Sequence, residues 1–170
     1  MKRNLIRLIV AGLLITAFGV YLRWNHERIE HGPVAQRINC VSNLKMIGIA
    51  FRMWEGDHGN QYPFNVSTNA GGTMELCAAD KDGFDRNAYL YLRTMTNDEL
   101  TIPPLLLICP QDRSKKAATN LTSLQAENIT YRFRSGPNVT ETNENEVLAI
   151  CPIDGNTLYC DGHVEKGKGK

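Results

Sequence analysis

The sequence predicts an α+β protein in which a long N-terminal helix, first apolar and then amphipathic, packs on a small antiparallel β-sheet. Three observations support this fold class. Residues 8–22 form an apolar stretch without a charge. Residues 34–54 repeat apolar side chains every three or four positions, which indicates one face of an amphipathic helix. Short apolar runs between Asp-Gly and Gly-Pro turn signals come late in the chain, where they indicate antiparallel strands.

Length, charge and composition limit the classes of protein to consider. The chain has 170 residues, enough for one modest domain, or for one domain with an appendage. The formal net charge is +1, from 19 basic and 18 acidic residues, so no overall field attracts nucleic acid. Hydrophobic residues make up 42% and charged residues 22%, which excludes wholesale disorder. Since the apolar residues are not gathered into several long runs, a polytopic membrane protein is excluded as well.

We interpret the N-terminal apolar stretch as a membrane anchor. Counted from Leu5, it is about 18 residues or about 27 Å of helix, against a hydrocarbon core of about 30 Å. Arg7 can extend its side chain to the head groups, and Tyr21 and Trp24 flank the far end as an aromatic belt does. A cleaved signal peptide and a buried core helix are the two alternatives. The side chains expected to contact lipid are Leu8, Leu13, Leu14, Phe18 and Leu22.

The charges that flank this stretch predict its orientation. Basic residues before it slightly outnumber those just after it, so we expect the N-terminus in the cytoplasm and the head in the periplasm or outside the cell. No other stretch approaches spanning length, which predicts a single-pass inner-membrane protein. The expected divisions are an anchor helix at 1–24, an amphipathic stalk helix at 25–56, an α+β head at 57–165 and a basic tail at 166–170.

The stalk helix is expected to kink or break at Gly32-Pro33, because proline suits the first turn of a helix. The helix should end near Glu55, before Gly56 and Asp57. Gly48 lies on its apolar face, where we expect it to permit close packing against the head. The predicted stripe consists of Val34, Ile38, Val41, Leu44, Ile47, Phe51 and Trp54.

The head is expected to combine short helices with a meander of four or five strands. Residues 74–79 predict a helical turn, and residues 85–95 a short helix that buries Ala88, Leu92 and Met95. Turn signals at Asp154-Gly155 and Asp161-Gly162 separate the last strands. The predicted strands are residues 105–109, 131–135, 147–151, 158–160 and 163–165.

The cysteines indicate an exported protein in an oxidising setting, with one or two disulfides. Cys109 and Cys151 are the disulfide candidates, because each ends a predicted buried strand just before a proline. The alternative is that several cysteines pack as small hydrophobic residues. Since no Cys-x-x-Cys pair is present, the sequence predicts no zinc site. The five cysteines are Cys40, Cys77, Cys109, Cys151 and Cys160.

The sequence offers no set of residues typical of an enzyme. It contains no nucleophile elbow, phosphate-binding loop or His-Glu-x-x-His motif, and its four histidines are scattered, so we predict a non-enzymatic protein without a cofactor. Asp154, Asp161 and Glu165 are candidate calcium ligands, since calcium prefers several oxygen donors. The alternative assigns both Asp-Gly pairs to turn formation alone.

Several segments carry a family resemblance by their order and spacing. They are Arg37-Ile38-Asn39-Cys40-Val41-Ser42-Asn43-Leu44-Lys45-Met46-Ile47-Gly48, Asp57-His58-Gly59-Asn60 with Tyr62-Pro63, Leu107-Ile108-Cys109-Pro110-Gln111-Asp112, and Leu158-Tyr159-Cys160-Asp161-Gly162-His163-Val164. Together they resemble a large pilin-like group found in planctomycetes and verrucomicrobia. The plan of anchor, amphipathic helix and small sheet is similar to that of type IV pilins and of type II secretion pseudopilins. The resemblance implies a protein-transport or pilus-like assembly whose subunits meet each other through their N-terminal helices.

The sequence departs from these families at two places. The pilin-like group carries a histidine ten positions before its last Asp-Gly, where this chain has Cys151, so a covalent role is open to Cys151 and Cys160. Prepilins carry a glycine before a Phe-rich start and a glutamate five residues into the mature helix, and neither occurs in this N-terminus. We therefore expect a minor subunit, or a pilin-derived domain that stays on its anchor. The alternative function is an anchored extracytoplasmic module that binds a ligand such as a polysaccharide and does not polymerise.

Overall fold

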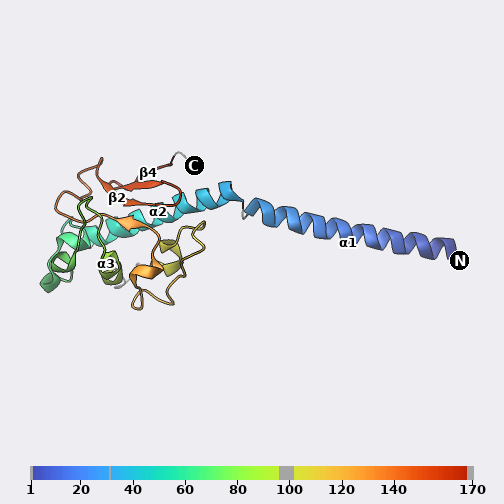
Figure 1. The fold of residues 1–170 in the computed structure, drawn as a ribbon, viewed down its shortest axis with the longest axis horizontal. Coiled ribbons are helices and arrows are strands. Elements are labelled where there is room, and N and C mark those ends of the chain that lie inside the picture. Colours follow the sequence, from blue (N-terminus) through green and yellow to red (C-terminus); the bar gives the residue numbers. More distant parts are fainter. Residues whose placement is uncertain (1, 31, 96–101, 168–170) are drawn as a thin grey trace. The chain divides into compact units, whose positions relative to one another are not determined.

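The computed structural model describes residues 2–30, 32–95 and 102–167 (Figure 1). Within these residues the fold is α+β, as predicted, with three α-helices and a four-stranded antiparallel sheet. The chain forms two compact units, Met1–Gln36 and Arg37–Lys170, and each is described by itself below.

Helix α1, Lys2–Glu30, makes up most of the first unit. Its side chains are described from Gly12 to His26, so the predicted lipid contact of Leu8 lies outside the described side chains. Thr16 donates its hydroxyl to the carbonyl of Leu13 at 2.9 Å. Among the described residues, no helix has both the length and the apolar character that crossing a membrane requires. The large apolar side chains of α1 that are at least half exposed, among those described, are Leu13, Leu14, Ile15, Phe18, Val20, Tyr21, Leu22 and Trp24.

Helix α2, Pro33–Asp57, confirms the predicted amphipathic helix and the predicted break before Pro33. The predicted stripe is wrong at its N-terminal end, because Val34 and Ile38 are 74% and 57% exposed. From Val41 onward the predicted stripe is confirmed, because Val41, Leu44, Ile47 and Phe51 are buried, and the buried face begins with the neighbouring Cys40. The fully buried side chains on this face are Cys40, Leu44, Ile47 and Phe51.

The sheet is the predicted meander, with strand order β1-β2-β3-β4 and antiparallel neighbours throughout. Its strands lie along α2 in Figure 1. A register irregularity between Val147 and Ala149 interrupts the β2–β3 pairing. The strands are β1 Arg132–Phe133, β2 Val147–Ile150, β3 Thr157–Tyr159 and β4 Val164–Glu165.

The strand predicted at residues 105–109 is wrong. Residues Pro104–Leu107 form the 3-10 helix η4, in which the amide of Leu106 donates to the carbonyl of Pro103 at 2.9 Å. Two successive prolines offer no N–H for a sheet ladder, and their fixed φ favours a tight turn. The predicted burial is confirmed for Leu107, Ile108 and Cys109, but it is wrong for Leu105, which is 69% exposed.

The helical turn predicted at residues 74–79 and the short helix predicted at residues 85–95 are both present. Residues Met74–Leu76 form the 3-10 helix η3, where a helical turn was predicted. Helix α3, Ala88–Thr94, is shorter than predicted, but Ala88, Leu92 and Met95 are buried as expected. Three further 3-10 helices are η1 Pro63–Asn65, η2 Thr68–Ala70 and η5 Ala126–Asn128.

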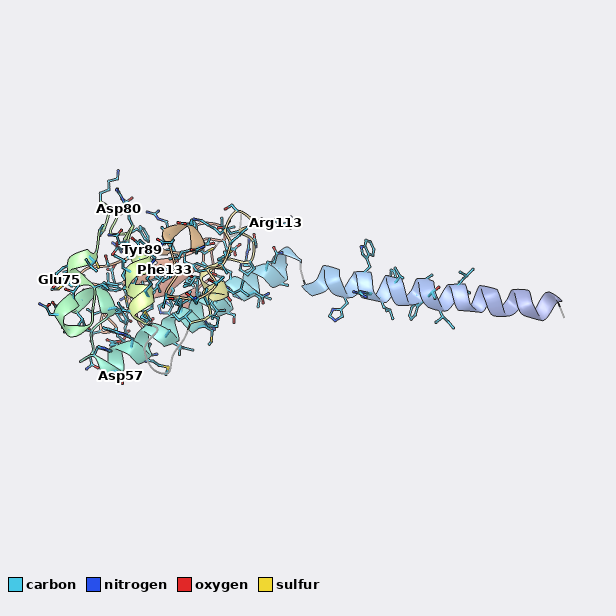
Figure 2. The ribbon with its side chains drawn as sticks, turned by 90° about the horizontal axis from the view of Figure 1, so that it is seen from below. Asp57, Glu75, Asp80, Tyr89, Arg113 and Phe133 are labelled. Atoms are coloured by element: carbon cyan, nitrogen blue, oxygen red, sulfur yellow. The ribbon has the colours of Figure 1, made fainter. Side chains whose placement is uncertain are left out.

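An aromatic cluster around Phe51 joins α2 to the rest of the head. The Phe51 ring stacks on Phe133 of β1 with centroids 6.0 Å apart, and meets Tyr62 edge-on at 5.5 Å. Phe64 and Tyr91 also contact Phe51. In Figure 2 Phe133 lies among the packed side chains of the head. Such contacts add about 0.5–1.5 kcal/mol per pair to the burial of the rings.

Gly48 lets α2 approach the sheet closely, as we predicted from its position on the apolar face of the helix. A Cβ atom at this position would lie 3.0 Å from Cδ1 of Leu158 and 3.5 Å from the Cα of Gly162. Since Leu158 belongs to β3 and Gly162 to the following turn, the missing side chain lets the helix backbone meet the β3–β4 hairpin directly.

We expect Phe51→Ala to lower the free energy of unfolding by about 3–5 kcal/mol, because it leaves a cavity at the centre of the aromatic cluster. Denaturant unfolding of the full chain measures this loss. Met53→Ala is the matched control, since Met53 is half exposed on the same helix. Its change should stay near 0.5 kcal/mol. Equal losses in the two variants would contradict the central role of Phe51.

Candidate functional site

Three thiols and one carboxylate meet in the core of the head. The Sγ atoms of Cys40, Cys109 and Cys151 and a carboxylate oxygen of Asp154 all lie within 4.8 Å of one another. We call these four residues the thiol cluster. All four are buried. Among the described residues, no other set of three or more cysteine, histidine or acidic side chains has this geometry.

Each member of the thiol cluster is positioned by local structure. Cys40 comes from the buried face of α2. Cys109 and Cys151 each precede a proline and begin a turn, in which the carbonyl of Cys109 accepts from the amide of Asp112 and that of Cys151 from the amide of Gly155. The second turn reverses at Gly155, whose φ of +71° favours glycine, and returns the chain to β3.

Hydrogen bonds link the cluster internally and to its surroundings. The Cys109 thiol donates to Oδ2 of Asp154 at 3.4 Å, and the amide of Asp154 donates to Sγ of Cys151 at 3.4 Å. The Tyr131 hydroxyl donates to Sγ of Cys40 at 3.7 Å. Nε of Arg37 lies 3.9 Å from Oδ1 of Asp154 and offsets part of the carboxylate charge.

The electrostatics of the cluster favour a negative charge on one sulfur. Interactions with the Cys109 and Cys40 side chains, and hydrogen bonds from the backbone amides of Asp154 and Ile153, lower the pKa of Cys151 despite its burial. The pKa of Cys109 is raised, first by its hydrogen bonds with Cys151 and Cys40 and then by burial.

The structure brings Cys109 and Cys151 together, and it adds Cys40 and Asp154, which the sequence analysis did not connect with them. All five cysteines are free thiols. A signal for Asp154 was present, because the tetrapeptides Cys-Pro-Gln-Asp at 109–112 and Cys-Pro-Ile-Asp at 151–154 repeat one pattern. Nothing in the sequence marks Cys40, whose place depends on how the loops pack against α2.

The three candidate calcium ligands do not converge. Asp154 belongs to the thiol cluster, whereas Asp161 accepts from the amide of His163 at 3.0 Å, and Glu165 accepts from the hydroxyl of Tyr159 at 2.9 Å. Each carboxylate therefore has a separate set of contacts, and the turn interpretation of the Asp-Gly pairs agrees better with the structure.

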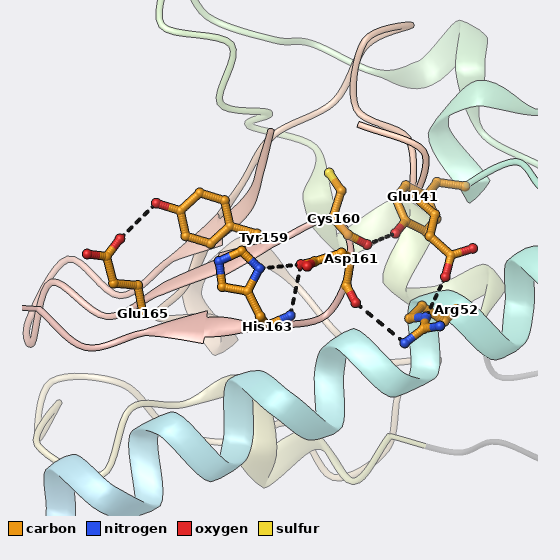
Figure 3. Close-up of polar contacts among 8 residues, drawn as sticks. Arg52, Glu141, Tyr159, Cys160, Asp161, His163 and Glu165 are labelled. Atoms are coloured by element: carbon orange, nitrogen blue, oxygen red, sulfur yellow. Dashed lines mark hydrogen bonds and ion pairs between the residues drawn. The ribbon is translucent and has the colours of Figure 1, made fainter. Parts of the chain in front are cut away.

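Polar residues around the β3–β4 hairpin form a surface network (Figure 3). Arg52 of α2 donates to Glu141 at 2.6 Å and to the carbonyl of Asp161 at 3.4 Å. The His163 ring stacks on Tyr159 with centroids 4.3 Å apart and contacts the Asp161 carboxylate. These contacts hold the hairpin against α2 and against the loop before β2. Their role is therefore structural.

A surface pocket of about 580 Å³ lies beside η1 and η3. Its lining carries no charged side chain, so it suits an uncharged ligand with apolar and hydroxyl surfaces. The lining residues are Asn60, Gln61, Phe64, Asn65, Met74, Cys77, Ala79, Ser135, Gly136, Pro137, Thr140 and Thr142.

Glu55 is a buried acid near the end of α2. Its side chain is 2% exposed, and its Oε2 atom has no hydrogen-bond partner. Burial, followed by the negative charge of nearby Glu141, raises the pKa of Glu55 from near 4.5 to about 7, although Arg52 acts in the opposite direction. Glu55 therefore stays protonated in the folded chain at a pH where the unfolded chain has already ionised it.

The chain matches no protein-family model, no curated protein and no solved structure. Its function is therefore inferred from its own residues.

We expect Glu55 to make the head less stable as pH rises from about 4.5 to about 7. The unfolded state loses its proton first, so folding is penalised by about 2–4 kcal/mol above this window. Glu55→Gln removes this ionisation, and its unfolding free energy should exceed that of the unchanged chain at pH 8 but not at pH 4. Urea unfolding at both pH values measures the difference.

The matched control for this test is Glu144→Gln, because Glu144 is exposed on the surface. Its effect on the free energy of unfolding should be small at both pH values. A gain for Glu55→Gln that is the same at pH 4 and pH 8 would show that the ionisation of Glu55 does not cause it.

Proposed function

We propose that the protein is a non-enzymatic, membrane-anchored, pilin-like or pseudopilin-like subunit of a type II secretion or type IV pilus-like assembly. The observation that carries this proposal is the exposure of the apolar side chains of α1. From Leu13 to Trp24, every large apolar side chain is at least half exposed. A helix with apolar side chains all round is stable when lipid or other helices surround it.

The size of the exposed apolar surface supports a nonaqueous environment. Removing a Val, Leu, Ile or Phe side chain fully from water contributes about 1.5–3 kcal/mol. Six such side chains are exposed between Leu13 and Leu22. The hydroxyl of Thr16 is already paired with the carbonyl of Leu13, so transfer to lipid leaves this group satisfied.

Two glycines on α1 favour association between helices. Gly12 and Gly19 lie seven residues apart and so share one helix face, and no atom lies within 4 Å of a Cβ built at either position. Small residues on one face let two helix backbones approach closely in a membrane. In the proposed assembly, α1 holds the subunit in the bilayer and meets sister helices through this face, while the head remains outside.

The arrangement of the head is consistent with the same proposal. The segments that carry the pilin-like resemblance form the buried face of α2, the turn after it, the Cys109 turn and the β3–β4 hairpin. Two of these parts, α2 and the β3–β4 hairpin, approach each other closely at Gly48 and Leu158.

A second candidate function is an anchored module that binds an uncharged ligand, such as a polysaccharide, and does not polymerise. The observation that favours it is the uncharged pocket beside Phe64 and Met74. Hydroxyl and amide groups with apolar surface are a common combination in sites for neutral small molecules.

Cysteine cross-linking in native membranes tests the proposal. We expect Gly12→Cys and Gly19→Cys to form disulfide-linked dimers, or links to other pilin-like subunits, because these positions lie on the proposed contact face. Leu14→Cys is the matched control, since it points about 200° away from Gly12 on the same helix and should form fewer links. Gel electrophoresis without reductant measures the linked fraction.

Three outcomes separate the candidates. Linking through the glycine face, in chains that resist alkaline extraction from membranes, supports the subunit. Membrane-bound chains that link at none of these positions favour the anchored module, and glycan binding that depends on Phe64 would identify it. Chains that alkaline extraction releases from the membrane contradict both candidates.

A further inference from the structure

We propose that the thiol cluster is a structural zinc site, in which Cys40, Cys109, Cys151 and Asp154 bind one ion. The four donor atoms lie within 4.8 Å of one another and come from α2 and two separate loops. This inference is independent of the proposed function, because it depends only on contacts within the second unit.

The distances suit a four-coordinate ion. In a tetrahedral site with Zn–S bonds of about 2.3 Å and a Zn–O bond of about 2.1 Å, the sulfur atoms lie about 3.8 Å apart and each sulfur about 3.6 Å from the oxygen. The observed separation between Sγ of Cys109 and Oδ2 of Asp154 is 3.4 Å. Since no pair of donors exceeds 4.8 Å, closing around an ion requires shifts of only about 1 Å.

The donor set selects zinc over calcium. Three thiolates and one carboxylate suit a borderline-soft ion, whereas calcium needs six or more oxygen donors. Four protein donors fill a tetrahedral shell, and the burial of all four leaves no open position for water. These features are typical of a zinc site that stabilises a fold and not of one that catalyses a reaction.

The groups around the cluster direct hydrogen bonds at sulfur, as thiolate ligands require. The amide of Asp154 donates to Cys151, and the Tyr131 hydroxyl donates to Cys40. Arg37 lies beside the outer oxygen of Asp154, so its positive charge balances part of the excess negative charge of a zinc ion with four anionic ligands. Such outer contacts orient metal ligands and tune their basicity.

Asn156 gives independent support. Its side chain is fully buried, and its Oδ1 accepts from the amide of Gly167 at 3.0 Å. Its Nδ2 atom is buried without a hydrogen-bond acceptor, and the Asn156 side chain interacts with the Cys40 thiol. An uncompensated buried N–H is costly, and a zinc-bound thiolate on Cys40 would accept it.

A disulfide between Cys109 and Cys151 is the competing state of the same residues. Oxidation of this pair by two electrons would join the two sulfurs and leave Cys40 beside Asp154. The disulfide accounts for two of the sulfurs, but not for the third thiol, the buried carboxylate or the donors aimed at Cys40. Zinc accounts for all of them.

Elemental analysis of the full chain, purified in detergent without chelators or reductants, tests the proposal. We expect one zinc ion per chain. Cys109→Ser and Asp154→Ala each remove a ligand, and each should lower the zinc content at least several-fold. Cys77→Ser is the matched control, because Cys77 lies outside the cluster, and its zinc content should equal that of the unchanged chain.

A measurement on the unchanged chain keeps the test valid where a variant fails to fold. After removal of the metal, titration with Co²⁺ should give thiolate-to-cobalt charge-transfer absorption and the intense visible bands of a four-coordinate ion, saturating at one equivalent. Zinc should then displace the cobalt. Returning zinc should also raise the unfolding temperature of the metal-free chain.

Counting thiols separates zinc from the disulfide. Alkylation of the denatured, chelated chain without reductant should modify five cysteines if zinc had protected the reduced thiols. Three modified cysteines, with a peptide map that links Cys109 to Cys151, and no bound zinc would overturn the proposal in favour of the disulfide. Five modified cysteines with neither zinc nor cobalt binding would overturn it as well.

Discussion

The packing of one face of α2 against the loops and the β3–β4 hairpin is the interaction on which the rest of the head depends. Phe51 occupies the centre of the aromatic cluster, and Gly48 lets the helix meet Leu158 at close range. Cys40, three turns before Phe51 on the same face, brings α2 into the thiol cluster. Because a single helix supplies all these contacts, a change in its rotation would disturb the core and the thiol cluster together.

Much of this arrangement could be predicted from periodicity and turn chemistry. The three-and-four spacing of α2 and the Asp-Gly turns at 154–155 and 161–162 predicted the helix and the order of the strands. Periodicity identified the inward-facing stripe from Val41 onward, but it could not show where along α2 the contact with the head begins, so Val34 and Ile38 were assigned wrongly to the buried face. The strand prediction at residues 105–109 was wrong because an apolar segment indicates burial but not backbone conformation. The two prolines before it favour the observed 3-10 helix.

The candidate site was less predictable, since most of it is created by contacts between distant segments. The Cys-Pro pairs at Cys109 and Cys151 suggested that these two thiols are neighbours. Cys40 required knowledge of where the loops cross α2, which the sequence alone does not contain. Glu55 is a similar case, because its perturbed pKa results from burial and from Glu141, which is remote in the sequence. Local patterns predict the elements of this protein better than the environments that those elements create.

The outer strands of the sheet have a consequence for how heads can crowd together. Both β1 and β4 are only two residues long, and β4 ends in Glu165. A long, flat outer strand offers a row of free backbone groups on which another chain can extend the sheet, and proteins limit this risk with short or charged edges. Heads with such short edge strands can be present at high local concentration without pairing their sheets edge to edge. Recognition between neighbouring subunits then depends on side chains and helices.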